Sequence, residues 1–151
     1  MQHYIVELNY IIETLKRFVN DYQELCIDTP ANVNSAIWIA GHAAFSLYDM
    51  IVRPLAPSYE FTANYITLFG TGSPRQIETE YPSYQEVLGK LDQLHKEVVR
   101  LIKSQDLDKI VLPKDLIEEG FFSIGNLITH TIQDIAYHNG QLSYLIKIVQ
   151  N

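Results

Sequence analysis

Long apolar stripes with helical spacing constrain this chain more than any other feature of its sequence. In residues 3–25 the apolar side chains recur every three or four positions, so they lie on one face of a helix. The same spacing is found in residues 83–104, which begin with a capping box at Ser83 and Glu86, and in residues 123–151. Helices of this kind bury their stripes against one another, so the pattern predicts an all-helical fold.

Residues 34–53 predict a helix of a different character. From Ala36 to Tyr48 no side chain carries a permanent charge, so we expect this helix to be buried on most of its sides. A side chain at residue 34 or 35 can cap its first turn, and Pro54 is expected to end it. The small residues Gly41 and Ala44 leave room for another helix or a ligand to approach closely.

The segment from residue 54 to residue 82 is irregular by comparison. It contains several prolines and glycines, and only residues 61–69 have the pattern of a short helix. A connection of this length usually folds over other elements or lines a site. Four long helices, with one long crossover between the second and the third, predict a four-helix bundle formed as a single domain by residues 1–151.

Charge and cysteine content exclude several classes of protein. The formal net charge is -7, the pI is about 5.1, and the basic residues are scattered. The chain therefore lacks the positive patch of a protein that binds nucleic acid or an anionic membrane. A single cysteine rules out an internal disulfide, and neither a signal peptide nor a long apolar run is present. We therefore expect a cytoplasmic protein with no membrane span.

Candidate metal ligands lie on two of the predicted helices. Three histidines, His42, His130 and His138, occur in apolar helical segments. Asp134 precedes His138 by four residues, and residues four apart share a face of a helix. Two imidazoles and one carboxylate are a ligand set that leaves coordination positions of a divalent metal open. We therefore hypothesise a metal site formed by His42, Asp134 and His138, with His130 pointing broadly inward.

A simpler interpretation of these residues stays open at this stage. A buried carboxylate needs a partner, and Asp134 can find one in a salt bridge or hydrogen bond with His130 or His138 without any metal. His3 and His95 have polar neighbours and are expected at the surface. No serine lies in a recognisable nucleophile turn, and no Glu-x-x-His pair indicates a di-iron centre.

Two motifs resemble the DinB superfamily. One is Trp38-x-x-Gly41-His42 on the second predicted helix, and the other is the tyrosine-histidine-asparagine-glycine-glutamine block at residues 137–141. Residues 69–83, with their Phe-Gly-Thr-Gly-Ser-Pro run, are also similar to members of this family. The resemblance covers nearly the whole chain in the order of its elements. It implies a four-helix bundle in which three residues hold one metal.

The resemblance also implies which residues bind that metal. His42 and His138 match two ligand histidines of the family, and Asp134 stands where the third ligand is usually histidine. An aspartate still binds Zn²⁺, Ni²⁺, Mn²⁺ or Fe²⁺, although it adds negative charge and makes the site harder. His130 matches a position that is often histidine, and we expect it to support the ligands rather than bind the metal.

Gly140 and Gln141, which lie two and three residues after His138, carry expectations of their own. Gly140 is expected to give room against the second helix, because it has no side chain. Gln141 is expected to hydrogen-bond a ligand side chain or a neighbouring backbone group. Both expectations come from residue size and polarity.

Characterised relatives include transferases of low-molecular-weight thiols, such as bacillithiol and mycothiol enzymes, and a maleylpyruvate isomerase. The resemblance thus implies a metal-dependent thiol S-transferase that joins a small thiol to an electrophile, and a homodimer. The alternative is a non-enzymatic dimeric bundle, for ligand binding or stress response, with a vestigial or structural metal site. Metal-dependent hydrolysis through a bound water is a third, weaker hypothesis.

Overall fold

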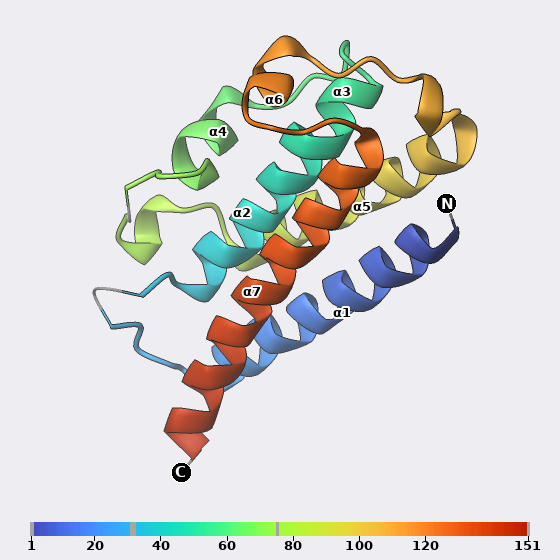
Figure 1. Cartoon of the computed structure of the whole chain (residues 1–151). Coiled ribbons are helices and arrows are strands. Elements are labelled where there is room, and N and C mark those ends of the chain that lie inside the picture. Colours follow the sequence, from blue (N-terminus) through green and yellow to red (C-terminus); the bar gives the residue numbers. More distant parts are fainter. Residues whose placement is uncertain (1, 31–32, 75, 151) are drawn as a thin grey trace.

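The computed structural model describes residues 2–30, 33–74 and 76–150 (Figure 1). All the regular elements formed by these residues are helical, which confirms the prediction of an all-helical fold. The four longest helices follow one another along the chain with shorter elements between them. They are α1 (Gln2–Glu24), α2 (Ala36–Leu47), α5 (Tyr84–Ser104) and α7 (Ile124–Gln150).

The shorter elements lie in the two long connections. Between α2 and α5 the chain forms the π-helix η1 (Tyr48–Val52), α3 (Arg53–Leu55), α4 (Ala63–Phe69) and the 3-10 helix η2 (Glu78–Glu80). Between α5 and α7 it forms the 3-10 helix η3 (Leu107–Lys109) and α6 (Lys114–Glu118). The first of these connections occupies the long irregular segment that the sequence predicts, and the short helix expected at 61–69 is observed as α4.

Pro54 does not end the second helix, so this prediction is wrong. The chain stays helical through η1 and α3 to Leu55. A proline in a regular α-helix collides with the carbonyl one turn earlier, but a π turn is wider. Pro54 directly follows such a turn, in which the Arg53 N–H bonds the Tyr48 carbonyl. The wider turn lets the helix continue past the proline.

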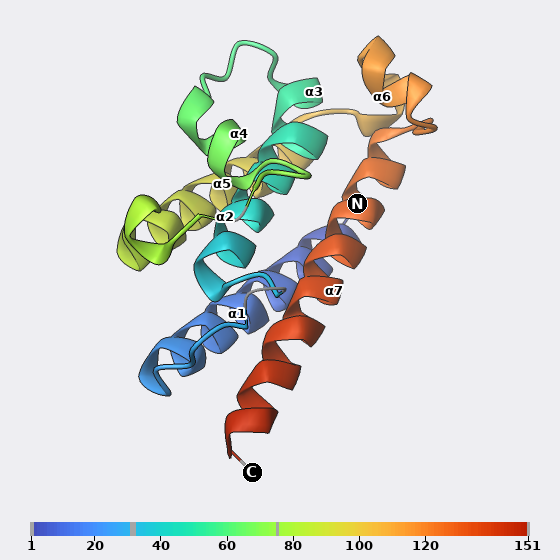
Figure 2. The same cartoon turned by 90° about the vertical axis from the view of Figure 1, so that its left-hand side faces the viewer.

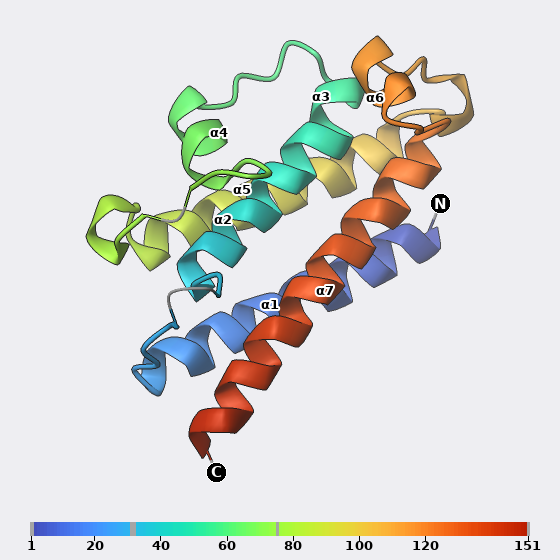
Figure 3. The same cartoon turned by 60° about the vertical axis from the view of Figure 1, so that its left-hand side comes forward.

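The long helices pack in pairs around one core. α1 runs alongside α7, α2 runs alongside α5, and α2 also faces α7 across the core (Figure 2). α4 covers α2 from the outside, and the connection that carries α6 lies where α7 begins (Figure 3). The apolar stripes predicted from the sequence supply the buried side chains, for example Leu8, Ile12 and Leu15 on α1.

α2 is the central element of this arrangement. Every residue of α2 except Phe45 is buried, as its lack of charge predicts. Ser35 caps its first turn by accepting a hydrogen bond from the Trp38 N–H. Because α2 is enclosed by α4, α5 and α7, any polar side chain on it must find its partner inside the protein. Among the helices that the structure describes, none has both the length and the apolar character to cross a bilayer.

Candidate metal centre

Three side chains with metal-binding atoms meet between α2 and α7. His42 comes from α2, and Asp134 and His138 come from successive turns of α7. One ligand atom from each residue lies within 4.8 Å of the other two. The His42 Nε2 atom is 3.4 Å from Asp134 Oδ2, and the His138 Nε2 atom is 3.7 Å from Asp134 Oδ1. The structure therefore brings together the three residues that the sequence singled out.

Burial differs between the imidazoles and the carboxylate. His42 is 5% exposed and His138 is 7% exposed, whereas the Asp134 side chain keeps 26% of its surface accessible. The two rings lie 5.2 Å apart at an angle of 76°, so their edges converge on the carboxylate from two directions. The site is closed on its inner side and open beside Asp134.

The hydrogen bonds of the two histidines decide which ring nitrogens face the centre. The Nδ1 atom of His42 lies 2.7 Å from the Phe69 carbonyl oxygen, which can only accept. The Nδ1 atom of His138 lies 2.9 Å from Gln141 Oε1, which also accepts. Each Nδ1 therefore carries the proton when the ring is neutral, and each Nε2 presents its lone pair to the centre. Histidine ligands of metals are oriented in this way.

The protonation states match those of a metal site. Burial acts to raise the pKa of the Asp134 carboxyl, but its interactions with His42, His138 and Ser46 outweigh burial and lower the pKa. Burial lowers the pKa of His138, although the hydrogen bond to Gln141 and the charge of Asp134 oppose it. An ionised Asp134 and a neutral His138 are the forms that bind a divalent cation.

The converging lone pairs of the three residues favour binding of a cation. Two neutral Nε2 atoms and a carboxylate repel one another at these distances unless a proton or a metal ion lies between them. Ser46 donates a hydrogen bond of 3.2 Å to Asp134 Oδ2, which holds the carboxylate but does not neutralise it. The donor set therefore fits a divalent metal that keeps open coordination positions.

Aromatic side chains enclose the histidines. The Trp38 indole stacks on His42 with the ring centroids 4.6 Å apart and an interplanar angle of 9°. The same indole meets the edge of His138, with the centroids 5.7 Å apart. These contacts restrict how either ring can turn. Sequence reasoning assigned no role to Trp38, Ser46 or Phe69 at the site. The spacing of four residues from His42 was a signal for Trp38 and Ser46, but Phe69 had none.

His130 does not point toward this centre. Its side chain is exposed, and its ring meets the Phe121 ring edge-on with the centroids 5.1 Å apart. The expectation that it points inward is wrong, because each step of four residues on a helix turns the side chain by about 40°. Two such steps separate His130 from His138. His130 therefore lies away from the three candidate ligands.

Gly140 and Gln141 have different surroundings. The Gln141 amide is the hydrogen-bond partner of His138. Gly140 is exposed, and a Cβ atom added there would meet nothing within 4 Å. The expectation that Gly140 makes room against the second helix is therefore wrong. The close approach to α2 occurs at Gly41 instead, and it is made by Phe69 of α4.

A groove lies between α2, α4 and the first turns of α7. It has a volume of about 710 Å³. Its lining begins one helical turn from the ligands, at Phe45 on α2 and at His130 on α7. The end of α4 and the turn after it form one side, and Phe121 lies on the other. The groove offers space for a small organic molecule, although none of His42, Asp134 and His138 is among its lining residues.

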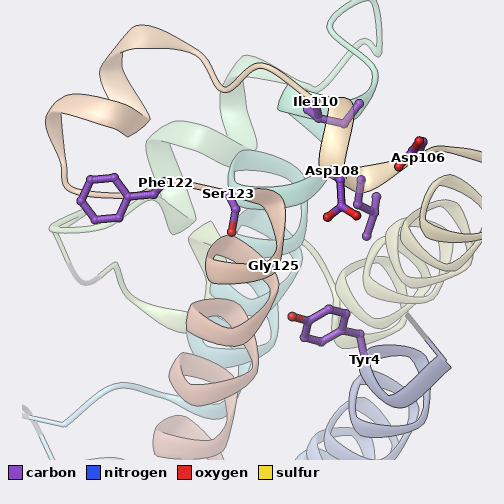
Figure 4. Close-up of a pocket in the computed structure, with 8 residues that line it drawn as sticks. Tyr4, Asp106, Asp108, Ile110, Phe122, Ser123 and Gly125 are labelled. Atoms are coloured by element: carbon purple, nitrogen blue, oxygen red, sulfur yellow. The ribbon is translucent and has the colours of Figure 1, made fainter.

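A second cavity lies away from the centre. Its volume is about 350 Å³, and it lies between the start of α1, η3 and the start of α7 (Figure 4). Tyr4, Asp108 and Ser123 line it, together with Asp106 and Phe122. None of His42, Asp134 and His138 contributes to its lining. This cavity therefore lies apart from the three candidate ligands.

Comparison with known proteins identifies the family of the chain. The family model of the DinB superfamily matches residues 10–142 of the chain. The matched range contains all three residues of the centre and both motifs on which the resemblance rests. No curated protein matches the chain.

Proposed function

Because the chain belongs to the DinB superfamily, we propose that it is a divalent-metal-dependent enzyme whose metal is held by His42, Asp134 and His138. One observation carries this proposal. Both imidazoles have their Nδ1 atoms occupied by acceptors, and both turn their Nε2 atoms toward one carboxylate. His42 Nε2 lies 3.4 Å from Asp134 Oδ2 and His138 Nε2 lies 3.7 Å from Asp134 Oδ1, so an ion between these atoms could bind all three residues.

We propose thiol S-transfer as the reaction. A bound ion of Zn²⁺, Ni²⁺, Mn²⁺ or Fe²⁺ supplies Lewis acidity that keeps a low-molecular-weight thiol deprotonated near neutral pH. The thiol would release its proton to solvent, and its sulfur would form a bond to an electrophilic carbon while the leaving group departs with its electron pair. The groove between α2, α4 and α7 accommodates the organic parts of the two reactants.

The residues around the centre have separate parts in this proposal. His42 and His138 supply neutral nitrogen donors, and Asp134 supplies negative charge that offsets part of the charge of the ion. Ser46 holds the carboxylate by a hydrogen bond. Trp38 shields His42 from water on the inner side of the centre.

We further propose that the long helices make a DinB-type four-helix bundle and that two copies of the chain associate. Large apolar side chains are exposed on the adjacent helices α1 and α7. Val6 and Tyr10 of α1 are 60% and 72% exposed, and Tyr137 and Tyr144 of α7 are 65% and 67% exposed. A surface of this kind favours pairing. Light scattering of the purified protein measures its mass, and a mass of one chain would contradict pairing.

The alternative function is a non-enzymatic dimeric bundle with a structural or vestigial metal site. The observation that favours it is Asp134 itself, which stands where the family usually has a third histidine. A bundle of this kind would keep the metal but would not accelerate thiol transfer. The two functions are therefore separated by activity of the metal-loaded protein.

Metal content of the purified protein is the test of the proposed function. Elemental mass spectrometry should find about one divalent metal per chain, and the Asp134→Ala and His138→Ala variants should lose it. His3→Ala is the matched control, because His3 is exposed on α1 and is remote in sequence from the ligands. Thiol transfer to an electrophile should then depend on the metal. A wild-type chain that takes up no Zn²⁺, Ni²⁺, Mn²⁺ or Fe²⁺ would overturn the proposal.

A further inference from the structure

The connection between α2 and α5 contacts one candidate ligand, His42, from outside the pair of helices α2 and α7. We propose that residues 68–73, at the end of α4 and in the turn after it, are a positioning clamp for His42. The clamp sets the orientation and the tautomer that His42 needs in order to bind a metal. This inference rests on the proposed metal site, but it concerns residues that hold a ligand in position and do not themselves bind the metal.

The first contact of the clamp is made by Phe69 against Gly41. A Cβ atom built on Gly41 would lie 2.3 Å from Cδ1 of the Phe69 ring, so no side chain fits there while the ring is in place. Phe69 is fully buried and stacks on Tyr81, with the ring centroids 5.4 Å apart at 18°. The ring therefore has no empty space beside it into which it can retreat. Gly41 is what lets the end of α4 reach the backbone of α2.

This close approach places a backbone acceptor beside the ligand. Gly41 directly precedes His42, and the carbonyl of Phe69 is the group that meets His42 Nδ1 at 2.7 Å. A buried N–H that loses its acceptor is costly, so the carbonyl stabilises the tautomer with the proton on Nδ1. That tautomer leaves the Nε2 lone pair pointing at the centre.

The second contact of the clamp runs through Trp38. The Trp38 Nε1–H donates to Ser73 Oγ over 2.9 Å, and Ser73 Oγ donates in turn to the Leu68 carbonyl over 3.0 Å. Trp38 lies flat on the His42 ring. The same short segment therefore fixes His42 at its edge through Phe69 and on its face through Trp38. Two independent contacts from one segment are what a positioning role requires.

A pair of glycine substitutions tests the clamp. Gly41→Ala places a methyl group against the Phe69 ring, whereas Gly140→Ala places one in open space. Both substitutions change glycine to alanine inside a helix, and both positions adjoin a ligand histidine or its neighbour. Helix propensity acts in the same direction in both variants. Any difference between them therefore reports the contact with Phe69.

We expect Gly41→Ala to weaken Zn²⁺ binding by about tenfold or more, measured by competition with a chromophoric chelator, because displaced supporting groups commonly cost that much. Gly140→Ala should bind Zn²⁺ with the affinity of the wild type. Equal affinity of Gly41→Ala and the wild type would overturn the clamp.

A second readout uses the metal-free protein, so that it does not depend on metal binding. The ¹⁵N spectrum of the imidazoles should show the proton of His42 on Nδ1 in the wild type. In Gly41→Ala this preference should be lost. If the wild type binds no metal but has this tautomer, the proposed function fails while the clamp stands. If the wild type binds Zn²⁺ but His42 carries its proton on Nε2 before binding, the clamp fails alone.

Rescue separates positioning from general destabilisation. In the double variant Gly41→Ala with Phe69→Leu, the smaller side chain should make room for the methyl group and restore at least part of the Zn²⁺ affinity. Ser73→Ala provides an independent test, because it removes the bridge to Trp38 without crowding α2. It should weaken Zn²⁺ binding severalfold even if Gly41→Ala fails to fold. No effect of Ser73→Ala together with no rescue would overturn the clamp.

Discussion

His42 and His138 face the same carboxylate, but they are held in different ways. His138 is oriented by Gln141, which lies three residues later on the same helix. His42 is oriented by the carbonyl of Phe69, which comes from the crossover 27 residues away along the chain. One half of the centre is therefore built within a single helix. The other half exists only once α4 has packed on α2.

The two ligands should differ in how sensitive their geometry is to substitutions elsewhere in the chain. A helix that carries a ligand together with its supporting group keeps their relative geometry whenever the helix forms. A ligand that is supported from another segment depends on every contact that positions that segment. We therefore expect substitutions in residues 68–73 to affect His42 but not His138, and substitution of Gln141 to affect His138 without disturbing the fold.

The largest effect should come from the residue that both halves share. Asp134→Ala should abolish stoichiometric metal binding, because it removes the only charged ligand. Asp134→His should retain a metal site and shift its preference from Mn²⁺ toward Zn²⁺ and Ni²⁺, because it replaces a hard oxygen by an imidazole. Elemental analysis after equilibration with each metal measures both outcomes. Loss of binding in both variants would mean that the charge of Asp134 is indispensable.

A change confined to α7 should have the next largest effect. Gln141→Leu removes the acceptor for His138 Nδ1 but keeps a side chain of similar size. We expect Zn²⁺ affinity to fall by about tenfold. The thermal unfolding midpoint of the metal-free protein should change little, since Gln141 is supported by its own helix. An unfolding midpoint that falls as much as that of Gly41→Ala would break the contrast between the two halves.

Acid should destabilise the metal-free protein through a histidine outside the centre. His95 on α5 was expected at the surface, but it is half-buried, and no hydrogen-bond partner for its buried Nε2 atom is found among the described residues. Burial lowers its pKa from 6.5, although the charges of Glu13 and Asp92 oppose this. The unfolded chain therefore takes up the proton at higher pH than the folded chain, and stability falls as the pH drops below about 7.

The His95→Gln variant tests this assignment. The unfolding midpoint of the wild type should fall between pH 7.5 and pH 5, and the fall should be smaller in the variant because one proton-binding group is gone. Burial also lowers the pKa of His138, so the variant should keep part of the dependence. Measurements in the presence of a chelator remove any contribution from metal. An identical fall in both proteins would assign the acid sensitivity elsewhere.

The smallest effect should come from Gly140→Ala. Gly140 lies in the interior of α7, and its open side faces solvent. Alanine at such a position typically stabilises a helix by about 0.5–1 kcal/mol. The free energy of unfolding from urea titration should rise by about this amount. A loss of stability would show that the glycine serves a contact made outside this chain, such as the pairing of two copies.

Sequence patterns predicted the elements of this fold well. The spacing of apolar residues predicts α1, α5 and α7, the capping box at Ser83 forms as expected, and the lack of charge in α2 corresponds to its burial. The prediction failed at Pro54, where a π turn accommodates the ring. Periodicity describes regular helices and does not report such local widening. The prediction that His130 points inward is wrong because each step of four residues turns the side chain by about 40°, and two such steps separate His130 from His138.

In the candidate centre, too, some features follow from the sequence alone and others only from the tertiary structure. The sequence alone determined that Asp134 and His138 share a face of one helix with Gln141 nearby, because spacing along a helix sets which side chains are neighbours. Only the tertiary structure decided that His42 lies opposite them and that Phe69 and Ser73 hold it there. Contacts between distant segments depend on how complete side chains fill the core, and this information is spread over many residues rather than held in one motif.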